Sequence, residues 1–192
     1  EYPYKIENIP DSETYFKEKF KRMVNYLKNN ASHISRKLGY RVDTDVLEGL
    51  LKSFQEILTD TDFGKTQLVH NDFVRGNILF SSEKIGDIYP ITGIIDFEKM
   101  LVGSPLIDVG RTLAFLHVDC KYKSVEEINR YFIDEGYGKI SVNSVLLQVY
   151  WYIDFWKFLQ SNPYESLNDN EHFIRTVKLL EECKCIIADD SK

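Results

Sequence analysis

Cysteine is scarce in this 192-residue sequence, which contains Cys120, Cys183 and Cys185 and no others. An odd number of cysteines without regular spacing argues against a secreted scaffold held together by disulfides. Cys183 and Cys185 form a lone C-x-C pair, and no second pair of cysteines or histidines nearby supplies the two further ligands of a structural zinc site. We therefore expect reduced thiols that bind no metal.

Long apolar runs are also missing. No stretch approaches the ~18 apolar residues that predict a membrane-spanning helix, and no signal-peptide pattern is recognisable, so we expect a cytoplasmic protein without membrane contact. Basic residues are outnumbered, since 24 Lys and Arg face 30 Asp and Glu for a formal net charge of −6. This balance argues against nucleic-acid binding, which requires a basic face. It is compatible with a cationic small-molecule substrate.

The residues that are present predict a folded, mainly helical protein. The sequence is 43% hydrophobic and 28% charged, a composition typical of one soluble domain or lobe. Apolar residues recur at helical spacing, with Ser12 as a plausible N-cap of the first helix. Another helix has Ser104 at its N-cap and Pro105 at its first position. The predicted helices cover residues 12–30, 44–58, 104–116, 124–135, 141–160 and 170–187.

Three short strands are predicted between these helices, at residues 66–70, 77–80 and 91–96. The polar segment between the last two predicts a hairpin. The fold class is therefore α+β, predominantly helical, with one small hairpin. The polar stretch HNDFVRGN (70–77) immediately precedes this hairpin, and loops on a rigid scaffold are where chemistry is most often found.

The hairpin region contains a set of side chains that suits phosphoryl transfer. This reaction needs positioned charge, with a carboxylate to orient the attacking hydroxyl and metal ions to bridge the phosphates. Magnesium prefers oxygen ligands such as carboxylates and amides, together with water and phosphate. Asp72 and Asn77 lie five residues apart on one loop, and Asp96 ends the strand that we expect to pair beside Asn77. The three groups would then converge from two adjacent segments.

The sequence also resembles a known family in this region. The segments HNDFVRGNILF (70–80), GIIDFE (93–98) and GSPLIDVGR (103–111) resemble the signature of the aminoglycoside phosphotransferase and choline kinase-like family. That family writes H-x-D-x-x-x-x-N, then an apolar strand ending in Asp, then G-x-P-x-x-D. Protein kinases use the related H-R-D-x-x-x-x-N and D-F-G, but this sequence has no D-F-G. The motif region covers about residues 66–116.

The resemblance implies a role for each matching residue. Asp72 would be the catalytic base, and Asn77 and Asp96 would bind Mg²⁺, with ATP or GTP as the phosphoryl donor. His70 would hold the loop, and Asp108 would brace it from the next helix. Asn71 departs from the glycine that the family commonly has, which affects backbone freedom more than chemistry. Taken singly, an Asp or an Asn in a loop is ordinarily a turn former.

A kinase of this type needs a second lobe with a glycine-rich hairpin over the phosphates and a strand lysine. The residues before His70 read as helices and contain neither feature, and the chain begins with Glu1 rather than Met. We therefore expect residues 1–192 to be the C-terminal, substrate-binding lobe of a protein-kinase-like fold, without its N-terminal nucleotide lobe and inactive by itself. The alternative is a complete, shortened protein that serves as a non-catalytic binding lobe.

The resemblance implies hydroxyl phosphorylation but leaves the acceptor open. A cationic aminoglycoside, as in an antibiotic-resistance enzyme, is the first hypothesis, and choline, homoserine or a similar metabolite is the second. Acidic residues for a cation include Glu98 and Asp154, with Asp119, Glu126 and Glu127 as further candidates. Trp151 could offer an aromatic face to a cation, although aromatic residues at helical spacing more often form the core. Glu98 and Arg75 could equally be solvated loop residues.

Overall fold

The computed structural model of the chain describes residues 9–39, 43–60, 64–138, 142, 144–161 and 170–183. Cys185 and the predicted helix beyond residue 183 lie outside the described residues. The secondary-structure elements, in chain order, are α1 (Ser12–Leu38), α2 (Thr44–Asp60), β1 (Gln67–Val69), η2 (Arg75–Asn77), β2 (Ile78–Phe80), β3 (Ile91–Ile94), η3 (Phe97–Lys99), β4 (Leu101–Gly103), α3 (Leu106–Asp119), α4 (Val125–Asn129), η4 (Arg130–Tyr137), α5 (Ser144–Ser161) and α6 (Glu171–Glu182).

Helices form the body of the molecule, and α5 lies at its centre, where it packs against α1, α2, α3 and α6. This position explains the apolar character of α5, because most of its side chains contact a neighbouring helix. Its aromatic residues lie in one large core with apolar residues from the other four helices. The predicted α+β, mainly helical fold class is confirmed. No helix within the described ranges is long and apolar enough to cross a membrane.

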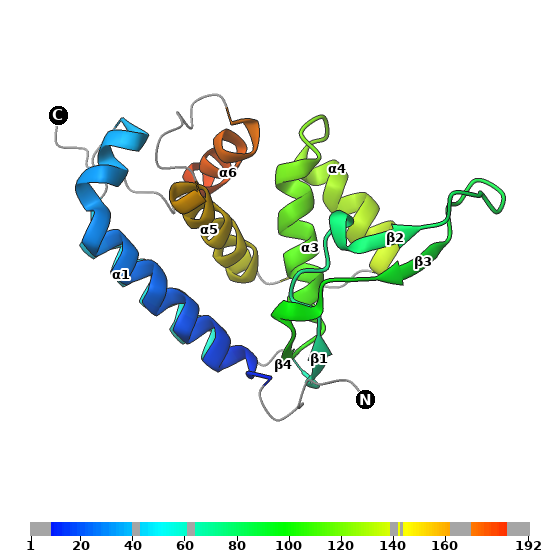
Figure 1. Ribbon diagram of the computed structural model, residues 1–192, viewed down its shortest axis with the longest axis horizontal. Coiled ribbons are helices and arrows are strands. Elements are labelled where there is room, and N and C mark those ends of the chain that lie inside the picture. Colours follow the sequence, from blue (N-terminus) through cyan, green and yellow to red (C-terminus); the bar gives the residue numbers. More distant parts are fainter. Residues whose placement is uncertain are drawn as a thin grey trace.

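Two small antiparallel sheets carry the loop that follows β1. The predicted hairpin is confirmed as β2 paired with β3, with Ile78 opposite Ile94, and it projects from the helical body in Figure 1. Strand β1 pairs with β4, so that Val69 lies opposite Leu101. Strand β4 was not predicted, because three residues between two polar segments give no periodicity to read. The chain after β3 thus returns to the strand that precedes the polar loop.

The first helix differs from the prediction at both ends. Its N-cap is Asp11 rather than Ser12, because the Asp11 carboxylate accepts hydrogen bonds from the backbone N–H (2.8 Å) and hydroxyl (2.9 Å) of Thr14. The predicted end at residue 30 is a kink, after which the helix continues to Leu38. Asn30 has non-helical dihedral angles, and its side chain donates to the carbonyl of Tyr26. This competing hydrogen bond accounts for the kink.

Other helices shift by smaller amounts. Helix α3 begins at Leu106, with Pro105 rather than Ser104 at the N-cap position, although the Ser104 hydroxyl still accepts from the Leu106 N–H. It continues three residues beyond its predicted end. The predicted helix 124–135 is a short α4, started by a capping box between Ser124 and Glu127, followed by a π-helical segment, η4. Differences of one or two residues at helix ends are ordinary.

Candidate active site

The polar loop begins where β1 ends, and helix α3 holds its first two residues. The Asp108 carboxylate, in the first turn of α3, accepts hydrogen bonds from the backbone N–H groups of His70 (2.9 Å) and Asn71 (2.6 Å). Thr112, one turn further along α3, donates its hydroxyl to the carbonyl of Phe73. Asp108 therefore lies where the sequence resemblance requires a brace, and α3 fixes the backbone of the loop at two points.

Asn71 has a left-handed backbone conformation, with φ of 57°. Asparagine tolerates this region better than most residues with a side chain, which explains how it replaces the glycine common in the family. Its buried side chain adds two hydrogen bonds. The amide oxygen accepts from the hydroxyl of Tyr150 (2.7 Å), and the amide nitrogen donates to the carbonyl of Lys99 (3.2 Å). Asn71 thus links the loop to α5 and to η3.

His70 joins the loop to the segment that follows β3. Its Nε2 lies 2.8 Å from the carbonyl oxygen of Ile95, so this nitrogen carries the proton and donates. The imidazole also packs against the ring of Phe97, with 4.8 Å between the ring centroids. Its Nδ1 is buried and has no hydrogen-bond partner among the described residues. This arrangement suits a histidine that holds the loop, because neither ring nitrogen is hydrogen-bonded to the Asp72 carboxylate.

The Asp72 carboxylate is nearly buried and contacts two cations. Its Oδ2 lies 2.5 Å from the Lys99 ammonium, and its Oδ1 accepts from Nε and Nη2 of Arg111, both at 3.3 Å. Burial is the largest influence on this carboxyl and raises its pKa, but the hydrogen bond from Lys99 and the charges of Arg111 and Lys99 outweigh it, so the pKa is lowered overall. Asp72 is therefore ionised at neutral pH.

Asn77 and Asp96 meet at the same end of the hairpin. The pairing of Ile78 with Ile94 brings the residues on either side of it together, and the Ile95 N–H donates to the Asn77 carbonyl at 3.0 Å. The Asn77 side-chain nitrogen donates to the backbone carbonyl of Asp72 (2.9 Å), and this hydrogen bond does not use its Oδ1. Asp96 is exposed and has a left-handed φ of 66°.

The donors at this hairpin end are one amide oxygen and one carboxylate. In the described part of the chain, no group of three or more acidic, histidine or cysteine side chains is arranged so that it could hold a metal ion. Structural zinc or calcium sites need more protein ligands than this, whereas magnesium keeps several waters and takes its other ligands from phosphates. The chemistry of Asn77 and Asp96 therefore fits Mg²⁺ delivered with a nucleotide.

Of the three residues predicted to bind the acceptor, one is exposed to solvent and two are engaged within the protein. Glu98 is exposed, with 71% of its side-chain surface accessible, and lies 3.8 Å from the Lys99 ammonium. Asp154 accepts a hydrogen bond from Arg111 (2.7 Å) and is 3.5 Å from Lys157, so protein cations already neutralise it. Trp151 belongs to the core, where its indole N–H donates to the carbonyl of Ala114. Its ring is therefore not an exposed aromatic face that could bind a cation.

The remaining acids have structural partners. Asp119 pairs with Arg75 at 3.2 Å, across an arginine side chain that is 72% exposed. Glu127 closes the capping box of α4, and Glu126 lies in the same first turn. None of these three carboxylates contacts Asp72, whereas Asp154 is joined to it through Arg111 and Glu98 through Lys99.

Sequence reasoning did not select four residues whose side chains form hydrogen bonds with the loop: Lys99, Arg111, Thr112 and Tyr150. A signal existed for Arg111, since it lies three residues after Asp108 and so on the same face of the helix. Lys99 directly follows Glu98 in the segment after β3. Tyr150 gave no signal of its own, because it is one of several aromatic residues on α5 and differs from them only by its contact with Asn71.

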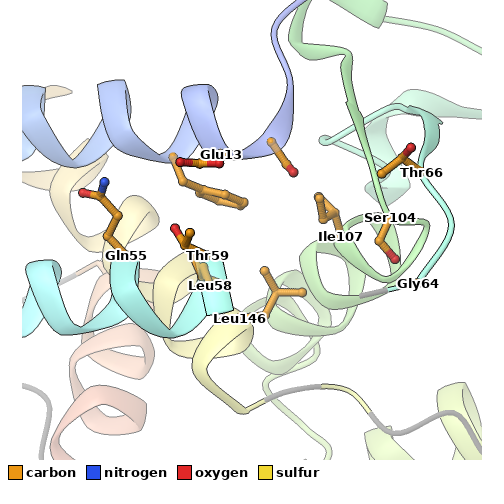
Figure 2. Close-up of a pocket in the computed structure, with 11 residues that line it drawn as sticks. Glu13, Gln55, Leu58, Thr59, Gly64, Thr66, Ser104, Ile107 and Leu146 are labelled. Atoms are coloured by element: carbon orange, nitrogen blue, oxygen red, sulfur yellow. The ribbon is translucent and has the colours of Figure 1, made fainter. Parts of the chain in front are cut away.

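A separate cavity of about 240 Å³ lies between α1, α2 and the start of α3. Figure 2 shows Glu13 and Gln55 at one side of it and Ser104 and Ile107 at the other. Its lining contains no residue of the polar loop or of the hairpin end. It is therefore not part of the candidate active site.

Comparison with protein families identifies the class of the chain. A model described as the phosphotransferase enzyme family matches residues 19–138, which is more than half of the chain and includes the loop, the hairpin and α3. The chain belongs to this phosphotransferase enzyme family, which associates it with phosphotransferase activity in general. Comparison with curated proteins and with solved structures gave no match.

Proposed function

We propose that this chain is the acceptor-binding lobe of a cytoplasmic kinase that transfers the γ-phosphoryl group of ATP or GTP to a hydroxyl of a small molecule. The observation that carries the proposal is the junction of loop and hairpin. The ionised Asp72 carboxylate lies there on the loop that ends at Asn77, and Asn77 is hydrogen-bonded through its backbone to the residue before Asp96. The family match supports the reaction class.

In the proposed reaction, Asp72 accepts a hydrogen bond from the acceptor hydroxyl and so orients the hydroxyl oxygen toward the γ-phosphorus. An O–P bond forms to the acceptor while the bond from the γ-phosphorus to the bridging oxygen breaks, and the nucleoside diphosphate leaves. The hydroxyl proton passes to Asp72. Mg²⁺ held by Asn77 Oδ1 and Asp96 would neutralise charge on the phosphates. Lys99, which contacts Asp72 at 2.5 Å, supplies a further positive charge close to the transferring group.

We further propose that a nucleotide-binding N-terminal lobe covers the hairpin. Its surface is unusually apolar for an exposed segment, since Ile85, Ile88 and Ile91 are 75%, 71% and 58% accessible. Contiguous exposed apolar surface often marks an interaction site. A lobe packed on the hairpin would enclose the phosphates beside Asp96, which supports the prediction that the chain alone turns over no nucleotide.

An aminoglycoside is the first acceptor to test, because the family resemblance includes such enzymes and the chain is acidic overall. The exposed carboxylate of Glu98 supports a cationic acceptor, whereas Asp154 and Trp151 do not, because both are already engaged within the protein. Choline and homoserine are the alternatives. A non-catalytic binding lobe is less well supported, since it has no need of Asp72, Asn77 and Asp96 together.

The test measures whether the intact protein, meaning this chain together with the proposed N-terminal lobe, phosphorylates kanamycin, choline or homoserine. Mg-ATP and Mg-GTP serve as donors. The expected result is release of nucleoside diphosphate together with an acceptor that gains the mass of one phosphate group, and loss of both signals in Asp72→Asn. Absence of any phosphorylated acceptor, with nucleotide hydrolysis equal in the wild type and in Asp72→Asn, would contradict the proposed function. A product from one acceptor alone would identify the substrate class.

A further inference from the structure

Arg111 has an unusual position beside Asp72. It lies on α3 one turn after Asp108, and 7% of its side chain is accessible. Its guanidinium binds two carboxylates from different parts of the chain: Nε and Nη2 donate to Asp72 Oδ1 at 3.3 Å, and Nη1 donates to Asp154 Oδ2 at 2.7 Å. The planar fork of arginine can span two carboxylates in this way, whereas a lysine ammonium acts as a single point charge.

The two oxygens of Asp72 thus have different partners. Oδ1 is bound by the buried Arg111, which Asp154 holds from the opposite side and which lies over the ring of Tyr150, 5.5 Å from its centroid. Oδ2 is bound by Lys99, whose side chain is 35% accessible. Lys99 can exchange its contact for water or for an acceptor, because its long stem is partly in solvent. Arg111 cannot do so without leaving two acidic groups without their buried partner.

We infer that Arg111, held by Asp154, is a positioning residue that fixes the Asp72 carboxylate so that Oδ2 faces the acceptor hydroxyl. This inference rests on the proposed function. Helix α3 then controls the reactive group twice: Asp108 fixes the backbone of the loop, and Arg111 fixes the side chain of Asp72. The Arg111–Asp154 pair reaches from α3 to α5, and so connects the reactive carboxylate to the rigid centre of the molecule.

Three variants of the intact protein test the inference. In Arg111→Lys the charge remains but the fork is lost, so kcat should fall by at least about tenfold, because small displacements of a reacting group are costly. The KM for Mg-nucleotide should stay within about twofold, since the polar contacts of Arg111 are with Asp72 and Asp154 and not with the proposed metal ligands. Asp154→Asn removes the charge that holds Arg111 but keeps an acceptor oxygen, and should lower kcat by a smaller factor. Arg130→Lys, in an exposed pair with Glu135, is the matched control and should leave kcat unchanged.

A double variant separates positioning from mere structural support. Removing Arg111 alone leaves both Asp72 and Asp154 without their buried partner and endangers the fold. Arg111→Met combined with Asp154→Leu replaces the Arg111–Asp154 pair with apolar side chains, which proteins often tolerate, and leaves Asp72 its contact with Lys99. Thermal unfolding should show a stable protein, and calorimetry should show unchanged binding of Mg-ATP. If Arg111 acts by positioning, kcat of this double variant remains low. If its role is only structural, restoring the fold restores kcat.

The outcomes distinguish this inference from the proposed function. Turnover is measured with the acceptor that the intact protein phosphorylates fastest, or with water as acceptor if none is phosphorylated. Arg111→Lys with kcat within about twofold of the wild type, or a stable double variant with restored kcat, would overturn the inference while Asp72→Asn remains inactive. If Asp72→Asn retains turnover, or if the wild type has none, the proposed function fails and the inference fails with it.

Discussion

Replacement of Asp72 by asparagine is the most direct test of the site, because it keeps the shape of the side chain and removes its charge. The amide oxygen can still accept from Arg111, but its nitrogen would face the Lys99 ammonium, which now lies 2.5 Å from Oδ2. Because the amide nitrogen and the ammonium are both hydrogen-bond donors, we expect Lys99 to move away. Arg111 keeps its hydrogen bond to Asp154, so we expect Asp72→Asn to fold.

The expected loss can be given a magnitude. A positioned general base contributes about 10²- to 10⁴-fold to a rate, which corresponds to about 2.7–5.4 kcal/mol at about 1.36 kcal/mol per factor of ten. The Asp72 pKa is already low, so the carboxylate is a weak base that mainly orients the hydroxyl and takes the proton late. We therefore expect kcat to fall by about 10²-fold or more, with little change in the KM for nucleotide.

The assay is steady-state kinetics of the intact protein across a series of magnesium concentrations. Asp134→Asn, an exposed substitution of the same type on η4, is the control and should behave as the wild type. High magnesium should not rescue Asp72→Asn, because the lost contact is with the acceptor. Near-normal kcat in Asp72→Asn, or rescue by magnesium, would refute the assignment of Asp72 as the base.

Three further predictions concern the metal, the packing and the pH dependence. Asp96→Asn should raise the KM for Mg-nucleotide, and excess magnesium should partly restore activity. Normal turnover of Asp96→Asn without excess magnesium would show that Asp96 is not a metal ligand. Gly110→Ala should lower the free energy of unfolding by about 1–3 kcal/mol, because the added Cβ would lie 2.6 Å from Cδ2 of Leu146, whereas Gly49→Ala, in open space on α2, should not lower it in the same urea titration. Burial lowers the pKa of His117, so the unfolded chain binds the proton more strongly than the folded chain. The free energy of unfolding should therefore fall as the pH drops below about 6.5. Urea titrations at pH 8 and pH 5 should show a smaller fall in this free energy for His117→Gln than for the wild type.

Local signals in the sequence predicted most helices and the hairpin, since spacing of apolar residues and turn composition are properties of short segments. The prediction failed where a side chain competed with the backbone, as Asn30 does inside α1. It also failed where an element is formed only by its partner, as β4 is by β1. Neither interaction leaves a periodic pattern in the sequence.

The candidate site was predicted from the order of its polar residues, and the structure brings Asp72, Asn77 and Asp96 to one end of the hairpin. Lys99 and Arg111 were missed because their contacts with Asp72 join positions 27 and 39 residues apart. Asp154 was predicted to contact the acceptor because an acid among aromatic residues attracts attention, yet its partner is Arg111. Ion pairs between distant segments cannot be read from spacing along one segment.

The hydrogen bonds of Asn71 also have a consequence for the way the protein reaches its native state. Its partners on η3, α3 and α5 are 28, 37 and 79 residues away in the sequence. Each of these contacts closes a long loop of the chain, and the chain loses conformational entropy on closing the loop before the hydrogen bond can offset that loss. The left-handed turn at Asn71 therefore has no local support. We therefore expect the conformation of the polar loop to form only after η3, α3 and α5 have docked against one another.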